Sequence, residues 1–278
     1  MTEACKNLEQ DLEQINNLYT ILIKEATKKV TKKTYNELYN LEYLADLEAK
    51  AEEFDKKIKT AHFRVVFFAI YDIVINMKIS INTNLMKLAK LFKKNGAKLY
   101  LVGGCVRNAM IGIPSFDTDV CSSLSPDAVA AFLDGTDFSY IFKNKDLGTM
   151  DIIYDGNVWE YTTLRKENYS DGGAHKPESV EFVKSLEVDS QRRDFSVNSI
   201  YVDIVKGEII DPNDGIRDIK KKQLRAVVDP NLVFLHDGLR ILRMIRFSSE
   251  LNFRIEPKTF IGAHTHRANL ADISGERK

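Results

Sequence analysis

The sequence has few cysteines, no excess charge of either sign and no long hydrophobic segment, and each absence excludes a class of protein. Three cysteines in 278 residues, Cys5, Cys105 and Cys121, are too few and too scattered for a disulfide framework or a zinc site. They favour a reducing cytoplasm. Lysine plus arginine and aspartate plus glutamate both number 40, so the overall charge indicates no nucleic-acid partner, and any basic surface must be local.

Membrane segments are not expected. The most apolar run, residues 65–77, contains Asp72, follows Arg64 and is shorter than the about 20 residues that span a bilayer. Residues 1–14 lack the apolar core of a signal peptide. A composition of 44% hydrophobic and 29% charged residues supports a globular protein with a real core, which we expect in the cytoplasm.

The first 60 residues contain neither glycine nor proline. Leu8, Leu12, Ile15 and Leu18 recur at helical spacing, and a second helix is expected from about residue 34 to 58. We therefore expect residues 1–76 to be an appended helical module. Its charges are most simply a solvated surface, and the alternative is a binding surface for an unknown protein partner.

The pattern changes at Met77. Asn82 or Thr83 can cap a short helix that runs to about Lys94, and Gly96 can end it. Strands are then expected at 98–102, 117–121, 138–142, 149–155, 157–164, 180–184, 200–205 and 208–211, and helices at 104–112, 125–134, 189–199, 214–222 and 237–252. The fold class is therefore α+β, with a mixed sheet in residues 77–212 and a helical part in residues 213–278.

Residues 99–119 carry the strongest chemical pattern. An apolar strand runs into Gly103–Gly104, where backbone N–H groups can approach an anion. Asp117 and Asp119 are one residue apart, so on a strand they share a face, where a divalent cation relieves their repulsion. This pattern predicts a phosphate-binding turn beside an Mg²⁺ pair. The alternative is an ordinary turn followed by a chance acidic strand edge.

Residues 158–165, VWEYTTLR, predict a strand with Trp159 and Tyr161 on one face and Glu160 on the other. Beside the aspartate strand, Glu160 would be a third carboxylate; otherwise it is an ordinary exposed glutamate. Residues 166–178 lack periodicity and predict a mobile loop, in which His175 is a surface histidine or a group that reaches the substrate.

Residues 189–200, DSQRRDFSVNSI, predict a short helix capped by Asp189 or Ser190. The segment supplies donors and acceptors suited to phosphate and ribose, namely Arg192, Arg193, Asp194 and Asn198. The alternative is a surface ion-pair cluster. Residues 211–219 predict a turn and a helix start, which would form a hinge between the sheet and the later helices.

Residues 236–247 place polar groups on an apolar helix at every third position: Asp237, Arg240, Arg243 and Arg246. An aspartate accepts a hydrogen bond from an exocyclic amine and an arginine donates to ring acceptors, so a pair of them can read a base edge. The remaining arginines can hold a triphosphate. The alternative is a helix bordered by salt bridges.

With these five motifs in this order, the chain resembles the class II tRNA nucleotidyltransferase and bacterial poly(A) polymerase family from about Leu99 to Lys278. The resemblance implies a polymerase-β-like catalytic head followed by a helical neck. It also implies that Asp117 and Asp119 hold Mg²⁺. The expected nucleotide-binding residues are Gly104 and Arg107 at the phosphates, Arg193 with Asp194 and Asn198 near the sugar, Asp237 and Arg240 as a protein template for CTP or ATP, and Arg243 and Arg246 to complete the site.

The implied reaction is addition of C and A to the 3′ end of tRNA, with release of pyrophosphate. Residues 145–153, KDLGTMDII, lack the basic-aromatic signature of the poly(A) polymerase branch, which favours CCA addition. The sequence departs from the family pattern at Asn108, at His236 and in the loop DGGAHKP, and the family's body and tail domains have no counterpart before Lys278. The alternatives are a poly(A) polymerase and a truncated, non-catalytic nucleotide-binding protein.

Overall fold

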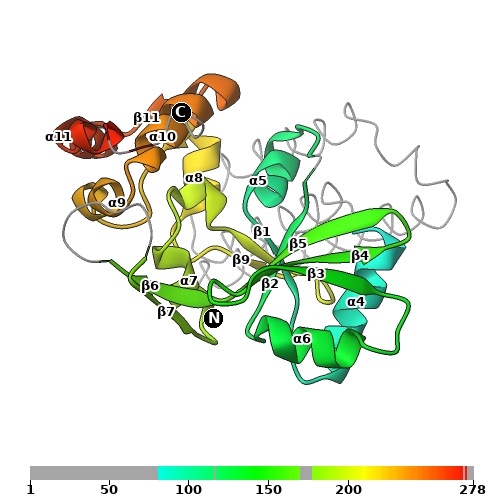
Figure 1. Cartoon of the computed structure of the whole chain (residues 1–278). Helices are drawn as coiled ribbons and strands as arrows, with labels where there is room; N and C mark the ends of the chain where they lie inside the picture. Colours follow the sequence, from blue (N-terminus) through cyan, green and yellow to red (C-terminus); the bar gives the residue numbers. More distant parts are fainter. Residues whose placement is uncertain (1–80, 116, 170–176, 272, 274–278) are drawn as a thin grey trace, which may run out of the picture. The chain divides into compact units, whose positions relative to one another are not determined.

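A seven-stranded mixed β-sheet lies at the centre of the structure (Figure 1). The computed structural model describes residues 81–115, 117–169, 177–271 and 273, which all belong to one compact unit of the chain, Ile75–Lys278. The helices expected in the first 60 residues, the apolar run at 65–77 and His175 lie outside the described residues. The proposed domain boundaries remain a prediction.

The strand order of the sheet is β3-β4-β5-β2-β1-β8-β9. The strands are β1 (Tyr100–Val102), β2 (Asp119–Ser122), β3 (Ser139–Asn144), β4 (Thr149–Tyr154), β5 (Asn157–Thr163), β8 (Tyr201–Asp203) and β9 (Ile209–Ile210). The β2–β5 pair is parallel and the other pairs of this sheet are antiparallel, which confirms the predicted mixed sheet. Two further strands, β6 (Arg165–Asn168) and β7 (Ser179–Phe182), form a separate antiparallel ribbon.

Two helices, α4 (Thr83–Lys94) and α6 (Pro126–Leu133), cover one face of the sheet (Figure 1). Asn82 caps α4 as expected, because its side chain accepts a hydrogen bond from the Leu85 backbone N–H. The ring of Phe92 on α4 packs edge-on against Phe132 of α6 and also contacts Tyr161 of β5. Burial of these aromatic rings anchors both helices to the sheet.

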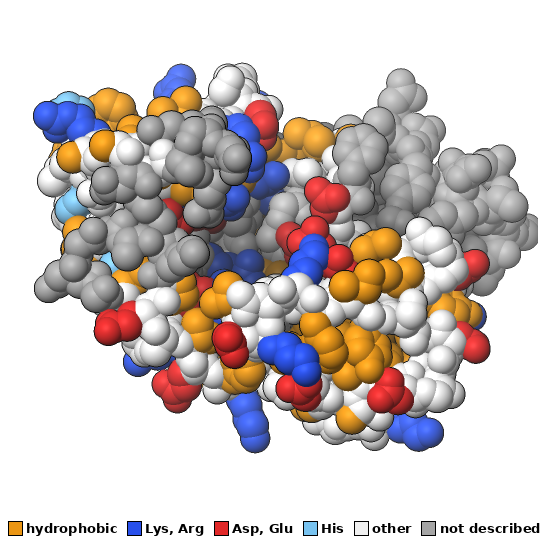
Figure 2. Space-filling view, viewed as in Figure 1, with side chains coloured by type: hydrophobic (Ala, Val, Ile, Leu, Met, Phe, Trp, Pro, Cys, Tyr) orange, Lys and Arg blue, Asp and Glu red, His pale blue; other side chains and the backbone are white. Residues whose placement is uncertain are grey.

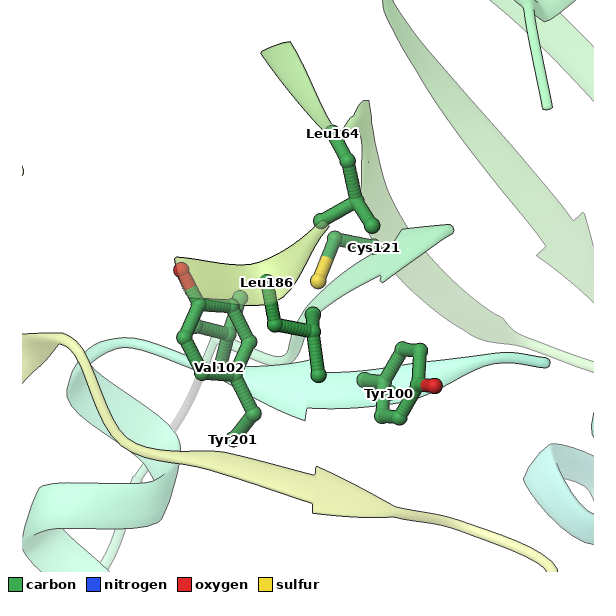
Figure 3. Packing of buried hydrophobic residues seen from close by; sticks show 6 residues of the cluster. All are labelled: Tyr100, Val102, Cys121, Leu164, Leu186 and Tyr201. Carbon is green, nitrogen blue, oxygen red and sulfur yellow. The ribbon is translucent and has the colours of Figure 1, made fainter. Parts of the chain in front are cut away.

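A second apolar cluster covers the opposite face over β1, β2 and β8 (Figure 3). Its members come from these strands, from the segment after β5 and from the start of α7 (Leu186–Gln191): Tyr100, Val102, Cys121, Leu164, Leu186 and Tyr201. This packing holds α7 beside the strand that begins with Asp119.

The chain after the sheet is mainly helical, as predicted. It contains α8 (Gly215–Lys220), α9 (Pro230–His236), α10 (Leu239–Leu251) and α11 (Pro257–Thr265), with a parallel pair formed by β10 (Gln223–Leu224) and β11 (Arg254–Ile255). Asp211 initiates α8 by accepting hydrogen bonds from the backbone N–H groups of Gly215 and Ile216. No helix in the described ranges combines the length and apolarity needed to cross a membrane.

Two local predictions were wrong. The helix expected over 189–199 is α7 followed by a separate 3-10 turn at Ser196–Asn198. Ser185 caps α7, whereas Asp189 is fully buried and binds other side chains. The loop expected over residues 166–178 was wrong for residues 166–168, which belong to β6 and pair with β7.

Candidate active site

One cleft, with a volume of about 640 Å³, collects the functional residues expected from the sequence. Acidic side chains of the sheet face basic side chains of the helices across this hollow (Figure 2). Its lining includes all twelve expected residues: Gly104, Arg107, Asp117, Asp119, Glu160, Arg193, Asp194, Asn198, Asp237, Arg240, Arg243 and Arg246. The fold therefore brings together motifs that lie more than 120 residues apart in the sequence, as the span from Asp117 to Arg246 shows.

The acidic wall is built on β2 and β5. Asp119 starts β2 and is paired in register with Glu160, so both side chains leave the same face of the sheet. Burial raises the pKa of Asp119 to about 6, and the negative charges of Glu160 and Asp117 contribute to the increase. A carboxylate in this position is stabilised when a cation binds beside it.

The residues present fit a divalent cation held by two carboxylates. Asp117 and Asp119 offer oxygen ligands, and Mg²⁺ is commonly bound by one or two carboxylates plus substrate phosphates. The Glu160 side chain is 56% exposed and lies 3.5 Å from the Lys143 ammonium. Within the described ranges, no group of three or more His, Cys, Asp or Glu side chains is close enough to form a metal site. Glu160 as a third catalytic carboxylate therefore remains a prediction.

Gly103 lies directly against the acidic wall. Its backbone has a φ of 81°, and a Cβ at this position would lie 2.9 Å from Oδ2 of Asp119. Glycine is therefore required both by the left-handed conformation and by the approach of the carboxylate. It places the start of α5 (Gly104–Ile111) at the cleft.

We expect Gly103→Ala to displace the Asp119 carboxylate and to reduce catalytic activity far more than it reduces stability. Gly96→Ala is the matched control, because Gly96 has a φ of 76° but a Cβ added there would meet no atom within 4 Å. Both variants should lose about 1–3 kcal/mol of stability from backbone strain at positive φ. Thermal denaturation and an activity assay on both proteins measure the two effects, and equal activity losses would contradict the steric role of Gly103.

Arg107 of α5 and Asn198 of the 3-10 turn are bound to each other on the basic side of the cleft. The Arg107 guanidinium donates to Oδ1 of Asn198 at 2.6 Å and to Oδ1 of Asn108 at 2.8 and 3.1 Å. Its charged group also lies 4.8 Å from the centroid of the Phe247 ring on α10. Asn108, one of the departures from the family pattern, thus accepts hydrogen bonds from this arginine.

Asp194 links the sheet domain to α10. Its Oδ2 accepts from Arg243 at 2.6 and 2.8 Å, and its Oδ1 accepts from Asn198 and from the backbone N–H of Phe195. The Asp194 carboxylate is buried, and burial alone would raise its pKa. The positive charge of Arg243 outweighs burial and keeps the pKa of Asp194 below its ordinary value. Asp194 and Asn198 therefore organise the arginines, and their expected contact with a sugar remains a prediction.

A buried ionic network behind Arg193 was missed by the sequence analysis. Asp189 accepts hydrogen bonds from Arg192, Arg193 and the Tyr201 hydroxyl, and Glu167 pairs with Arg165 at 2.7 Å. Tyr169 donates to Glu167 at 2.6 Å and reaches the cleft. Three consecutive charged residues, 165–167, were the available signal, but the segment lacks the apolar residues that usually indicate a strand.

The residues of α10 differ in their exposure. Arg240 is 8% exposed and donates to the backbone carbonyls of Arg192 and Val233, at 2.8 and 3.4 Å. Asp237 precedes the helix and accepts from the Leu239 N–H. Arg246 is more than half exposed and lies 3.8 Å from Glu250. Along the cleft, the arginines at every third position of α10 thus change from buried at Arg240 to exposed at Arg246.

Residues 99–225 match a family model described as the poly(A) polymerase head domain. This match and the mixed sheet place residues 99–225 in the class II tRNA nucleotidyltransferase and poly(A) polymerase family. The head has the polymerase-β-like α+β fold expected from the sequence.

The similar proteins within this family are CCA-adding enzymes. The chain is 37% identical over 194 residues to the CCA-adding enzyme of Bacillus licheniformis, covering 69% of this chain and 47% of that protein. It is 40% identical over 186 residues to that of Streptococcus mutans, covering 66% and 45%. The crystal structure of the Bacillus stearothermophilus CCA-adding enzyme in complex with CTP matches with a TM-score of 0.61 and 35% identity, over 69% of this chain and 45% of the other. The chain therefore spans about half the length of the curated relatives it matches.

Proposed function

We propose that this chain transfers CMP and AMP from CTP and ATP to the 3′ end of tRNA and releases pyrophosphate. The observation that carries the proposal is that two aspartates and a row of arginines face each other in one cleft. This arrangement suits a nucleoside triphosphate, because the arginines match its charge and the carboxylates can hold the cation that accompanies it. The names of the similar proteins, which are CCA-adding enzymes, support the same assignment.

Each wall of the cleft has a distinct proposed task. Arg107, Arg193, Arg243 and Arg246 bind the phosphates, and the backbone of Gly104 at the start of α5 approaches them without a side chain. Asp237 and Arg240 read the base edge, since one accepts and the other donates hydrogen bonds. Asp194 and Asn198 hold the arginines and approach the sugar.

Asp117 and Asp119 are the proposed ligands of Mg²⁺. When bound, the ion lowers the pKa of the attacking 3′-hydroxyl and neutralises charge on the phosphates. The protein's own contribution is to fix the two carboxylates on one sheet face and to hold the arginines at the leaving pyrophosphate. The scattered cysteines support a cytoplasmic site of action.

A direct test measures transfer of labelled CMP and AMP from α-labelled nucleotides to a tRNA transcript that lacks its terminal CCA. We expect ordered addition of C, C and A in the presence of Mg²⁺. Extension with A alone, in long tracts, would instead identify a poly(A) polymerase. Nucleotide binding without any extension would identify a non-catalytic protein and overturn the proposal.

Arg240→Ala should change nucleotide selection more than Mg²⁺ dependence. Arg240 is fixed by two backbone carbonyls, so its guanidinium presents donors to a base in a constant direction. Loss of a bidentate contact costs about 1–3 kcal/mol of discrimination, so we expect a change of about tenfold or more in the ratio of CTP to ATP use. Competition assays with both nucleotides measure this ratio. Arg254→Ala, at an exposed position in β11, is the matched control, and an unchanged ratio in Arg240→Ala would remove the templating role.

A further inference from the structure

Among the described residues, no helix covers the active-site face over the outer strands of the sheet. On this face, Ile141 of β3 and Val158 of β5 are 58% and 53% exposed, and Ile153 of β4 is paired with Val158 in the register. The alternate residues of the same strands are buried on the opposite face, where Met150, Ile152, Trp159 and Tyr161 are at most 2% exposed. We call the face formed by Ile141, Ile153, Val158 and Lys143 the open face. Hydrophobic side chains are exposed to solvent over this part of the sheet (Figure 2).

The open face continues directly into the acidic wall. Ile141 is paired with Asp151, Asp151 with Glu160, and Glu160 with Asp119, so one row crosses four strands from the open face to the cleft. Side chains paired across neighbouring strands lie on the same face and close together. An occupant of the open face therefore reaches the carboxylates without crossing any other element of the sheet.

The positions of the arginines assign the two substrates to different sides of the carboxylates. Across the sheet the order is β3, β4, β5, β2, β1 and β8. The cleft arginines lie on α5, which follows β1, on β6, on the segment before β8 and on α10. The leaving phosphates belong with these arginines. In phosphoryl transfer the attacking and leaving oxygens are roughly in line, so the attacking hydroxyl has to enter from the opposite side. That side is the open face.

Lys143 places an ammonium group between the open face and the acidic wall, where it pairs with Asp151 and Glu160. Its ammonium lies 2.8 Å from Oδ1 of Asp151 and 3.5 Å from Oε1 of Glu160, and its side chain is 43% exposed. The ion pair with Asp151 holds the ammonium in place, while the exposed part of the side chain leaves room for an anionic group. An apolar strip with one fixed cation suits a short single strand of RNA, whose sugars and bases pack on aliphatic groups and whose phosphates pair with ammonium groups.

We propose that the open face binds the 3′-terminal nucleotides of the RNA primer and aims the terminal hydroxyl at the cleft. The proposal rests on the proposed nucleotide transfer for the direction of attack. It assigns the aliphatic contacts to Ile141, Ile153 and Val158 and a backbone phosphate contact to Lys143.

Photo-crosslinking in the full chain tests this placement without relying on catalysis. A photoreactive amino acid, benzoylphenylalanine, replaces Ile141 in one protein and Ile261 of α11 in the control, since both side chains are more than half exposed. The probe is a tRNA transcript without CCA that is labelled at its 3′-terminal nucleotide. We expect crosslinking at position 141 that exceeds the control and is competed by unlabelled transcript. Equal yields, or a crosslink from position 141 to another protein segment or a second copy of the chain, would overturn the proposal.

Two sets of variants test the chemistry of the contact. The double variant Ile141→Glu and Val158→Glu should raise the KM for the primer by about tenfold and leave the KM for CTP unchanged, because added negative charge repels RNA. Ile261→Glu controls for a new charge on an exposed apolar position. Lys143→Ala should lower the slope of log affinity against log salt by about 0.7, the value for one phosphate contact with a single strand. An unchanged slope would remove the assigned role of Lys143.

The outcomes separate this inference from the proposed function. Specific crosslinking by a chain that adds no nucleotide would leave the RNA surface intact and reject nucleotide transfer. Nucleotide addition with no specific crosslink at position 141 would support nucleotide transfer and reject the open face as the RNA surface.

Discussion

Replacing Asp119 with asparagine is expected to reduce nucleotide addition by at least about 10³-fold, which corresponds to about 4 kcal/mol of transition-state stabilisation. The substitution keeps the size of the side chain and removes the charge that would hold a cation beside the substrate phosphates. Asp117→Asn should have a comparable effect. Rates of CMP incorporation under single-turnover conditions measure the loss, and Asp137→Asn, at an exposed position, is the control. Retention of more than a few per cent of activity would reject the metal-ligand assignment.

The same Asp119→Asn variant should be more stable than the parent protein at neutral pH in the absence of metal. Burial raises the pKa of Asp119 from 3.8 to about 6, so the folded state favours the protonated form. The parent therefore loses stability as pH rises from about 4 through about 6, by on the order of 2 kcal/mol. Asparagine has no proton to lose, so denaturation of the variant should not show this decrease. A parallel pH dependence in both proteins would contradict the electrostatic description of the acidic wall.

Replacing Asp189 with alanine is expected to give the largest loss of stability. Asp189 is fully buried and accepts from Arg192, Arg193, the Tyr201 hydroxyl and the backbone N–H of Arg165. Removing one partner of a buried ionic group leaves uncompensated charge and costs about 3–5 kcal/mol. For a unit of this size the loss corresponds to a Tm about 10 °C lower. Thermal denaturation of Asp189→Ala measures the effect, and Asp137→Ala should change stability by less than about 0.5 kcal/mol.

The charge of Asp189 also predicts how the protein responds to acid. Burial alone would raise its pKa, but Arg193 and Arg192 outweigh burial and lower the pKa from 3.8 to about 2. The resulting stabilisation is fully present above about pH 4 and is lost as pH falls through about 2. Asp189→Asn should lack this acid-dependent stabilisation. The difference in the free energy of unfolding between the parent protein and Asp189→Asn should therefore become smaller in acid. A constant difference from about pH 2 to pH 6 would show that the lost stability comes from packing alone.

Local patterns in the sequence predicted the strands and several cleft residues, whereas Arg107 was expected only from the family resemblance. Period-two alternation located β5 and the face of Glu160, and the side-chain cap at Asn82 located α4. The spacing of three in α10 placed Arg240, Arg243 and Arg246 along the cleft. The motifs also supported the family assignment, which the comparisons confirm.

The errors arose where long-range contacts override local preference. Asp189 was expected at a helix cap, where aspartate is common, but Arg192, Arg193 and Tyr201 bind it inside the protein. Strand β6 is composed of Arg165, Lys166, Glu167 and Asn168, and it forms because β7 pairs with it and because Arg165 and Glu167 bind each other. Arg192 and Arg193 are close to Asp189 in the sequence. Tyr201, the Arg165 backbone and the β7 partner of β6 lie outside any short window, so propensity could not reveal them.

The arginines of the cleft are oriented by other groups of the protein. Arg107 is held by Asn108 and Asn198, Arg193 by Asp189, Arg240 by two carbonyls and Arg243 by Asp194. Their rotational freedom is thus lost when the chain folds and need not be lost again when a triphosphate arrives, which makes association entropically less unfavourable. Nucleotide affinity should consequently depend on the residues that orient the guanidinium groups as well as on the groups that touch phosphate.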